Sequence, residues 1–459
     1  MPNLSYGTQP PQCNTSFNCN GNVDTFAFSA HVNVTTIYVI PADEPEVTQW
    51  EDTMNKITTL AYAGLLSAVA APLWAQDVTL RVWDTFADQT TGMDAFIAAF
   101  EEANPGIKIE RDVQSIDEMR PVLQTALNAG TGPDVMYYDT GPAFAGALAE
   151  AGLLLPLDDM YDGGMLDAVY PWTRERASFD GTSYGVGNEV EFLGVYYNRE
   201  MFADLGLEVP TTHEEFVGVA EALKEAGNVP IAFGDADGWP AFHIFSLYAN
   251  NIVGKSDLEA MIAGDKSWND PAVVASIEPF FVEMNNAGLL APSVNAVNYD
   301  DSINLFTAGL SGMMVTGTWL IQAMNDSGLD VGWFFLPAPD GMTTLPPAGL
   351  GSGYFVSKGT EHPEEAKAFL EFLFDPANAS YWVEGMSVVP PYAVDTTGME
   401  IAPLTSFAME ALATVPMGYN IDVLTPDAFN TTMLDGFQAV LGGDRTSAEQ
   451  AAALAASVE

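Results

Sequence analysis

Aromatic and acidic side chains recur along this chain where strands are predicted to end and turns to begin. Tryptophan and tyrosine rings pack on the apolar C–H face of a sugar ring, and carboxylates accept hydrogen bonds from its hydroxyl groups. Each charge-assisted hydrogen bond of this kind contributes roughly 1.5–3 kcal/mol. The pattern predicts a site that binds a small polar ligand, with the candidate residues Trp83, Asp84, Tyr138, Asp139, Glu189, Glu191, Trp239, Trp319 and Tyr354.

Trp319 is the candidate whose position is best defined by the residues around it. It closes the stretch FTAGLSGMMVTGTW, residues 306–319, in which glycines flank a short apolar strand. Glycine supplies the backbone freedom for the bends, so the tryptophan follows the end of a strand, where α/β sheets bind ligands. Residues 298–300 are further candidates, whereas we expect His243, Trp382 and Tyr419 to be packed core or surface residues.

Catalysis would need a nucleophile with its base, or a spaced pair of carboxylates. The chain has no glycine-rich phosphate loop. Glu189 and Glu191 could be the acid and base of a glycosidase, but residues i and i+2 of a strand lie on one face with limited separation. We expect a binding protein, and a secreted carbohydrate-active enzyme is the alternative.

Metal ligands are sparse, and we expect no metal and no cofactor. Beyond residue 53 the histidines are His213, His243 and His362, and none forms an H-E-x-x-H pair. The acidic run at residues 158–162 lacks the glycine and the terminal glutamate of a calcium loop. A solvated surface explains this run better.

The net charge of −48, from 62 acidic and 14 basic residues, restricts the partners. Nucleic acids and anionic membranes bind Lys/Arg patches, so both are expected to be repelled. Phosphorylated sugars and dicarboxylates usually require an arginine, and the candidate segments carry hardly any basic residue. A neutral sugar is therefore predicted, and a polyamine or other cationic ligand is the alternative.

Residues 54–75 have the pattern of a secretory signal peptide. Lys56 precedes an apolar run at residues 60–73, and Ala75 lies at the expected cleavage point. The run is too short to be a transmembrane helix. A signal peptide does not function 53 residues inside a chain, so we interpret residues 1–53 as a mis-annotated extension and Met54 as the true start.

The two cysteines, Cys13 and Cys19, both lie in this extension. The alternative is a genuine extension in which they form a disulfide. Without residues 1–75 the chain keeps 56 acidic and 13 basic residues, a net charge of −43, and has no cysteine for lipid attachment. We therefore expect a soluble periplasmic protein without a lipid anchor.

Strands and helices alternate in the first part of the predicted mature chain. Residues 78–84, 107–113 and 134–138 are predicted strands, and residues 92–103 and 115–130 are predicted amphipathic helices. This order indicates βαβ crossovers and a parallel sheet. Because that unit is complete, the β-rich segment at residues 184–197 has to continue into a second sheet.

The order of several short sequences resembles that of a known family. The turn ANPGI, the sequence AGTGPD and the strand VMYYD are followed by Tyr184-Gly185 and by YNREMF at residues 197–202. Residues 306–319 match the family pattern F-x-x-G-x-x-A-M-x-x-x-G-x-W, although Leu310 and Gly312 depart from its usual Lys and Ala. The chain resembles the extracellular solute-binding proteins of ABC importers, in the carbohydrate-binding family that includes maltose-binding protein.

The resemblance implies an α/β fold of two lobes, each a central β-sheet flanked by helices, joined by a multi-strand hinge. The expected N-lobe is 76–188 plus 341–374, and the expected C-lobe is 189–340 plus 375–459. Glu191, Trp319 and the loop after VMYYD would line the cleft. The expected function is capture of a neutral sugar by hinge closure and delivery to an inner-membrane ABC permease, with the protein acting as a monomer.

Overall fold

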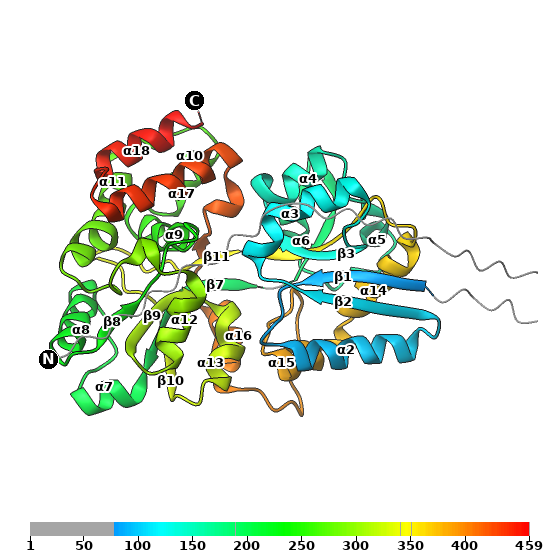
Figure 1. Ribbon diagram of the computed structural model, residues 1–459, viewed down its shortest axis with the longest axis horizontal. Helices are drawn as coiled ribbons and strands as arrows, with labels where there is room; N and C mark the ends of the chain where they lie inside the picture. The colour runs from blue at the N-terminus through cyan, green and yellow to red at the C-terminus, as the bar shows by residue number, and fades with distance from the viewer. Residues whose placement is uncertain (1–77, 189, 340, 350, 459) are drawn as a thin grey trace, which may run out of the picture. The chain divides into compact units, whose positions relative to one another are not determined.

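The computed structural model describes residues 78–188, 190–339, 341–349 and 351–458, which belong to one compact unit, residues 72–459. The predicted extension, the predicted signal peptide and Glu189 lie outside the described residues. Two β-sheets, each covered by helices on both faces, organise the described chain (Figure 1).

The first sheet has the strand order β2-β1-β3-β12-β6. Strands β1, β2 and β3 are parallel, as the alternation of strands and helices predicts, and β12 runs antiparallel to β3 and β6. The bounds are β1 (Val78–Asp84), β2 (Ile107–Val113), β3 (Val135–Asp139), β6 (Gly185–Gly187) and β12 (Ser352–Val356), with a small hairpin of β4 (Ser178–Phe179) and β5 (Thr182–Ser183).

Two hydrophobic cores lie on opposite faces of this sheet because successive strand residues point to opposite sides. Val135 and Tyr137 of β3 pack into one core, and Met136 and Tyr138 pack into the other. Helices α2, α14 and α15 cover the first face and α3 covers the second (Figure 1). The helices around this sheet are α2 (Thr90–Ala103), α3 (Ile116–Ala129), η1 (Pro142–Gly146), α4 (Ala147–Glu150), α5 (Asp158–Asp162), α6 (Pro171–Arg176), α14 (Pro363–Phe374), η5 (Pro376–Asn378) and α15 (Ala379–Met386).

The second sheet has the order β13-β11-β7-β9-β8, with β10 also paired to β7. Leu193 and Val195 of β7 face one core, whereas Phe192 and Tyr196 face the other. The bounds are β7 (Glu191–Asn198), β8 (Val229–Ala232), β9 (Ser311–Gly317), β10 (Val331–Phe334), β11 (Pro347–Gly349) and β13 (Gly418–Tyr419).

Helices that precede and follow β9 in the chain cover this second sheet. Before β9 lie α7 (Arg199–Leu205), α8 (His213–Glu225), α9 (Pro240–Ile252), α10 (Lys255–Ile262), α11 (Pro271–Ile277), η2 (Glu278–Met284), η3 (Val294–Ala296) and α12 (Tyr299–Thr307). After β9 lie η4 (Thr318–Leu320), α13 (Ile321–Asp326), α16 (Pro403–Thr414), η6 (Asp422–Leu424), α17 (Asp427–Gly442) and α18 (Ser447–Ala456). No helix within the described residues is both long and apolar enough to span a membrane.

The chain passes between the sheets where β6 leads to β7, where β11 leads to β12 and where α15 leads to α16. The structure differs here from the expected domain bounds. Strand β11 pairs with β7 of the second sheet, although residues 341–374 were assigned to the first lobe. Helix α15 packs on the first sheet, although residues 375–459 were assigned to the second lobe, because Trp382 is fully buried and its ring lies 5.3 Å from that of Phe96.

Candidate binding site

A cavity of about 770 Å³ lies where loops of the two sheets meet. The residues that follow the carboxyl ends of β1 and β2 line it, at 85–89 and 114–117, and so do residues that follow β8 and β9. Ligands bind outside the carboxyl ends of strands in open α/β sheets, and pockets of this size hold small molecules. This cavity is the candidate site.

Aromatic side chains of the second sheet's helices form one wall. The indole of Trp319 donates a hydrogen bond from Nε1 to the hydroxyl of Tyr299 at 2.7 Å. The ring centroid of Trp239 lies 4.4 Å from that of Tyr299, and the ring of His243 lies 5.1 Å from that of Trp319. We call Trp239, His243, Tyr299 and Trp319 the aromatic wall, and all four line the cavity.

Gly317 explains how Trp319 reaches this position. Strand β9 ends at Gly317, and the 3₁₀ turn η4 begins at Thr318. A Cβ atom on residue 317 would collide with the six-membered ring of Trp319. Only glycine therefore lets the indole fold back over the strand end.

Arg120 is the centre of a charged cluster on the first sheet's side. Its Nε donates to Asp139 at 2.8 Å, its Nη1 donates to Asp117 at 3.2 Å, and its guanidinium lies over the ring of Phe144. Burial alone would lower the pKa of Arg120, but the two carboxylates raise that pKa above its usual value. Asp117 follows the N-cap residue Ser115 of α3, whose hydroxyl accepts a hydrogen bond from the Glu118 amide.

His243 is neutral in this environment. Burial, together with the positive charge of Arg120, lowers the pKa of His243 to about 3. The imidazole therefore belongs to the aromatic wall without adding a positive charge at physiological pH.

Glu191 is the first residue of β7, the strand that the chain enters when it passes from the first sheet to the second. The amide of Gly351 donates a hydrogen bond to Glu191 Oε2 at 3.2 Å. A Cβ atom on residue 351 would collide with that carboxylate oxygen, so glycine is required for this approach. Glu191 lines the cavity beside the segments that connect the two sheets.

Asn420 and Asp422 bring buried oxygens to the cavity from the segment after β13. Their side chains are 6% and 7% exposed, and Oδ1 of each has no hydrogen-bond partner among the described residues. Burial and the negative charge of Asp139 raise the pKa of Asp422 to about 6, against the opposite effect of Arg120.

Carboxylates from both sheets' loops also meet at the edge of the cavity. Asp88 follows β1, Asp237 precedes α9, and Asp300 lies in the first turn of α12. The pKa of Asp88 is raised by burial and by the charges of Asp326 and Asp300, and the pKa of Asp300 is raised by burial and by Asp237. The edge of the cavity is therefore strongly acidic.

Comparison with known proteins identifies the family. Residues 83–380 match the model for bacterial extracellular solute-binding proteins, which is more than half of the chain. The chain belongs to this family. Its two-lobed α/β fold and its resemblance to the solute-binding proteins of ABC importers are thereby confirmed.

Relatives and solved structures agree with this assignment. The multiple sugar-binding protein of Streptococcus mutans is 25% identical over 379 residues, which are 77% of this chain and 87% of that protein. An ABC transporter extracellular-binding protein of Pyrococcus horikoshii is 28% identical over 308 residues, 65% of this chain and 68% of its own length. The solved structure of a chitin oligosaccharide binding protein has a TM-score of 0.73 and 26% identity, and the match covers 83% of this chain and 98% of that one.

In this solute-binding protein, four of the residues predicted from the sequence line the cavity. They are Asp139, Glu191, Trp239 and Trp319. The further candidates Tyr299 and Asp300 also line it. Glu189 lies outside the described residues.

Trp83, Tyr138 and Tyr354 do not line the cavity. Tyr354 is fully buried in the core shared by β3 and α14, and its ring centroid lies 5.3 Å from that of Tyr137. Tyr138 is buried in the core under α3, and Trp83 packs against the same core. Because the sheet is covered on both faces, these rings pack between its strands and helices.

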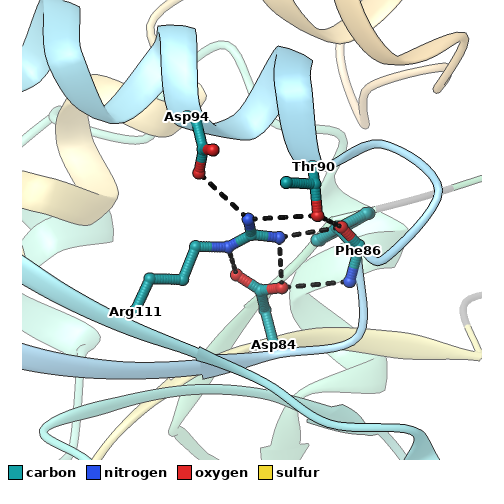
Figure 2. A network of polar contacts seen from close by, with 5 residues as sticks. All are labelled: Asp84, Phe86, Thr90, Asp94 and Arg111. Carbon is teal, nitrogen blue, oxygen red and sulfur yellow. Dashed lines mark hydrogen bonds and ion pairs between the residues drawn. The ribbon is translucent and has the colours of Figure 1, made fainter.

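Asp84 also lies beneath the cavity, where it positions the loop after β1 (Figure 2). Its carboxylate accepts hydrogen bonds from Arg111 Nε at 2.6 Å and Nη2 at 2.8 Å, and from the Phe86 amide at 3.0 Å. Arg111 Nη2 also donates to the Phe86 carbonyl at 2.8 Å, and its Nη1 contacts Asp94. The ion pair therefore fixes the loop whose next residues reach the cavity.

Arg120, Asp422 and His243 are cavity residues that were not among the predicted contacts. The sequence gives a weak indication for Arg120: it lies three residues after Asp117 in a predicted helix, a spacing at which the two side chains can form an ion pair. The sequence gives no indication for Asp422, because its segment, η6, reaches the cavity through contacts with η1, which is distant in the chain. His243 was expected to be structural, and it does pack on Trp239 and Trp319.

Proposed function

We propose that this protein captures a sugar in the cavity by closing its two lobes and delivers it to an ABC permease. The observation that carries the proposal is the aromatic wall of one lobe facing the carboxylate and guanidinium cluster of the other across about 770 Å³. Aromatic rings match the apolar face of a pyranose, and the polar cluster matches its hydroxyl rim. The named functions of the Streptococcus mutans relative and of the chitin oligosaccharide binding protein support the same ligand class.

The proposed mechanism is a hinge closure that the ligand stabilises. Aromatic contacts come from the second sheet's side, and Asp139 and Arg120 come from the first. A ligand that contacts both sides binds the closed state better and shifts the population toward it. The segments that connect β6 to β7, β11 to β12 and α15 to α16 are where the backbone would bend.

The proposed role includes no catalytic step. Membership in a solute-binding family supports this, as does the use of Asp139 and Glu191 in hydrogen bonds to Arg120 and to the Gly351 amide.

The proposed location is the periplasm, reached through a signal peptide at residues 54–75 and without a lipid anchor. Peptide mass spectrometry of the protein purified from its native cells tests this, with an N-terminus at residue 76 expected. A peptide from residues 1–53 in the mature protein would contradict the proposed start. We also propose that the protein is a monomer, which sedimentation with and without sugar would test.

A thermal-shift screen tests the proposed ligand class. The panel contains neutral mono- and oligosaccharides, amino sugars, polyamines and amino acids, followed by calorimetric titration of each positive. We expect one or more sugars to raise the melting temperature. Stabilisation by polyamines alone would replace the sugar with a cationic ligand, and hydrolysis of a glycoside during incubation would favour an enzyme.

A further inference from the structure

We propose that the captured sugar carries a free, protonated amino group and that Asp422, with Asn420, receives its ammonium in the cavity. This inference rests on the proposed sugar-binding function and deepens it by naming the chemical class of the ligand. Three observations support it: buried acceptors in the cavity lack hydrogen-bond partners, donors at the cavity are already bonded to other residues, and the lining carries a negative charge.

The first observation is a pair of buried acceptors that lack donors. Asp422 Oδ1 and Asn420 Oδ1 have no partner within the described part of the chain, and both residues line the cavity. Both side chains are more than nine-tenths buried. Burying an acceptor without a donor is unfavourable, and more so when the acceptor is charged, so a donor from a bound molecule is favoured here.

The second observation is that both indole donors at the cavity, and two of the three guanidinium nitrogens of Arg120, already have acceptors. The indole Nε1 of Trp319 is bonded to Tyr299, and that of Trp239 is bonded to Asp117. Arg120 uses Nε for Asp139 and Nη1 for Asp117.

A hydroxyl group and an ammonium group of a ligand would fit these acceptors differently. A hydroxyl group brings one donor together with lone pairs that need donors of their own, whereas an ammonium brings three donors and no acceptor. Beside two free acceptors and committed donors, the ammonium is the better match.

The third observation is the charge of the cavity wall. Among the described lining residues, one guanidinium, that of Arg120, faces the carboxylates Asp88, Asp117, Asp139, Glu191, Asp237, Asp300, Asp422 and Asp427. Asp139 and Asp422 are buried, so bulk salt screens them less than the exposed acids of the surface. A cationic ligand offsets this charge, and a neutral ligand leaves it in place.

The aromatic wall explains why the cation is expected on a sugar. Trp239 and Trp319 are half-buried and line the cavity, so a ligand ring can pack on them while its amine reaches Asp422. A linear polyamine would satisfy the carboxylates but has no ring face for these indoles. An amino sugar uses both features.

Calorimetric titration with matched ligand pairs tests the inference on the full-length protein. The pairs are glucosamine with glucose, galactosamine with galactose, mannosamine with mannose, and the β-1,4-linked glucosamine dimer with cellobiose, all at pH 7. We expect an amine to bind at least ten-fold more tightly than its hydroxyl partner. In Asp422→Asn this preference should fall to less than three-fold, and in Asp444→Asn, an exposed charge-matched control, it should be unchanged.

Asn420→Ala is the second variant, and it keeps the carboxylate while removing the neighbouring acceptor. We expect it to weaken amine binding several-fold, which makes the inference testable even if Asp422→Asn does not fold. Hydroxyl sugars that bind as tightly as their amine partners would overturn the inference and leave the sugar-binding function standing. Binding of spermidine without any sugar, or of nothing in the panel, would overturn both.

Discussion

Trp239 and Asp117 join the two sides of the cavity through one hydrogen bond. The indole Nε1 of Trp239, which precedes α9, donates to Asp117 Oδ2 in the first turn of α3 at 3.2 Å. Asp117 also accepts from Arg120, so the bond links the aromatic wall to the charged cluster. The bond therefore joins side chains of the first sheet's side of the cavity to side chains of the second sheet's side.

Trp239→Phe keeps an aromatic ring and removes the donor to Asp117. We expect ligand affinity to fall about three- to ten-fold, because a hydrogen bond contributes roughly 0.5–1.5 kcal/mol and this one connects the two sides of the cavity. Calorimetric titration with the sugar identified in the screen measures the change. Trp333→Phe is the matched control, since Trp333 Nε1 is buried without a partner among the described residues and lies away from the cavity. Equal losses in both variants would argue against a role for the Asp117 bond.

Trp319→Ala removes the ring that Gly317 allows to fold over the end of β9. We expect ligand binding to weaken ten-fold or more, equivalent to about 1.4 kcal/mol or more, while the protein remains folded. Circular dichroism and calorimetric titration of the same sample measure fold and affinity. A variant that unfolds would assign Trp319 to the core, against which it also packs.

Asp84→Asn breaks the buried ion pair with Arg111. Both side chains are at least nine-tenths buried, so we expect the free energy of unfolding to fall by about 3 kcal/mol or more, because a buried charge is left without its partner. Urea unfolding measures this loss. Asp330→Asn removes the exposed partner of Arg199 and should cost less than about 1 kcal/mol. A stable Asp84→Asn protein that has lost ligand binding would instead indicate a direct ligand contact.

Asp422 makes stability depend on pH. Burial and Asp139 raise its pKa to about 6 in the folded protein, whereas Arg120 acts in the opposite direction. Between pH 4 and pH 6 the folded state keeps a proton that the unfolded chain has lost, so this group lowers the free energy of unfolding as pH rises, by up to about 3 kcal/mol.

Asp422→Asn cannot titrate, so it should gain stability relative to the natural protein as pH increases from 4 to 7. Urea unfolding of both proteins at the two pH values measures the difference. An equal difference at pH 4 and pH 7 would show that Asp422 has an ordinary pKa.

The order of helices and strands was readable from local sequence. The apolar spacing in residues 92–103 predicted α2, the helix predicted at residues 115–130 contains α3, and the strand predicted at residues 78–84 coincides with β1. These features depend on neighbouring residues, because periodicity, caps and glycine turns act over a few positions. The same local order, read together, was sufficient to predict the family.

The neighbouring residues Tyr137 and Tyr138 show where local reasoning fails. They are adjacent in β3, yet Tyr137 reaches the cavity and the first core, whereas Tyr138 is buried in the core under α3. Both faces of the sheet are covered by helices, so residues 135–138 of the strand are all apolar or aromatic and the pattern does not distinguish the faces.

The amino-acid sequence by itself determined the element order, the acidic charge, and the placement of Trp239, Trp319 and Glu191 at strand ends and the hinge. The tertiary structure alone decided that Asp84 holds a loop and that Asp422 reaches the cavity beside Asp139. The physical reason is the range of the interactions. Turns and amphipathic faces are set by neighbouring residues, whereas burial, orphaned acceptors and opposed charges arise only when distant segments pack together.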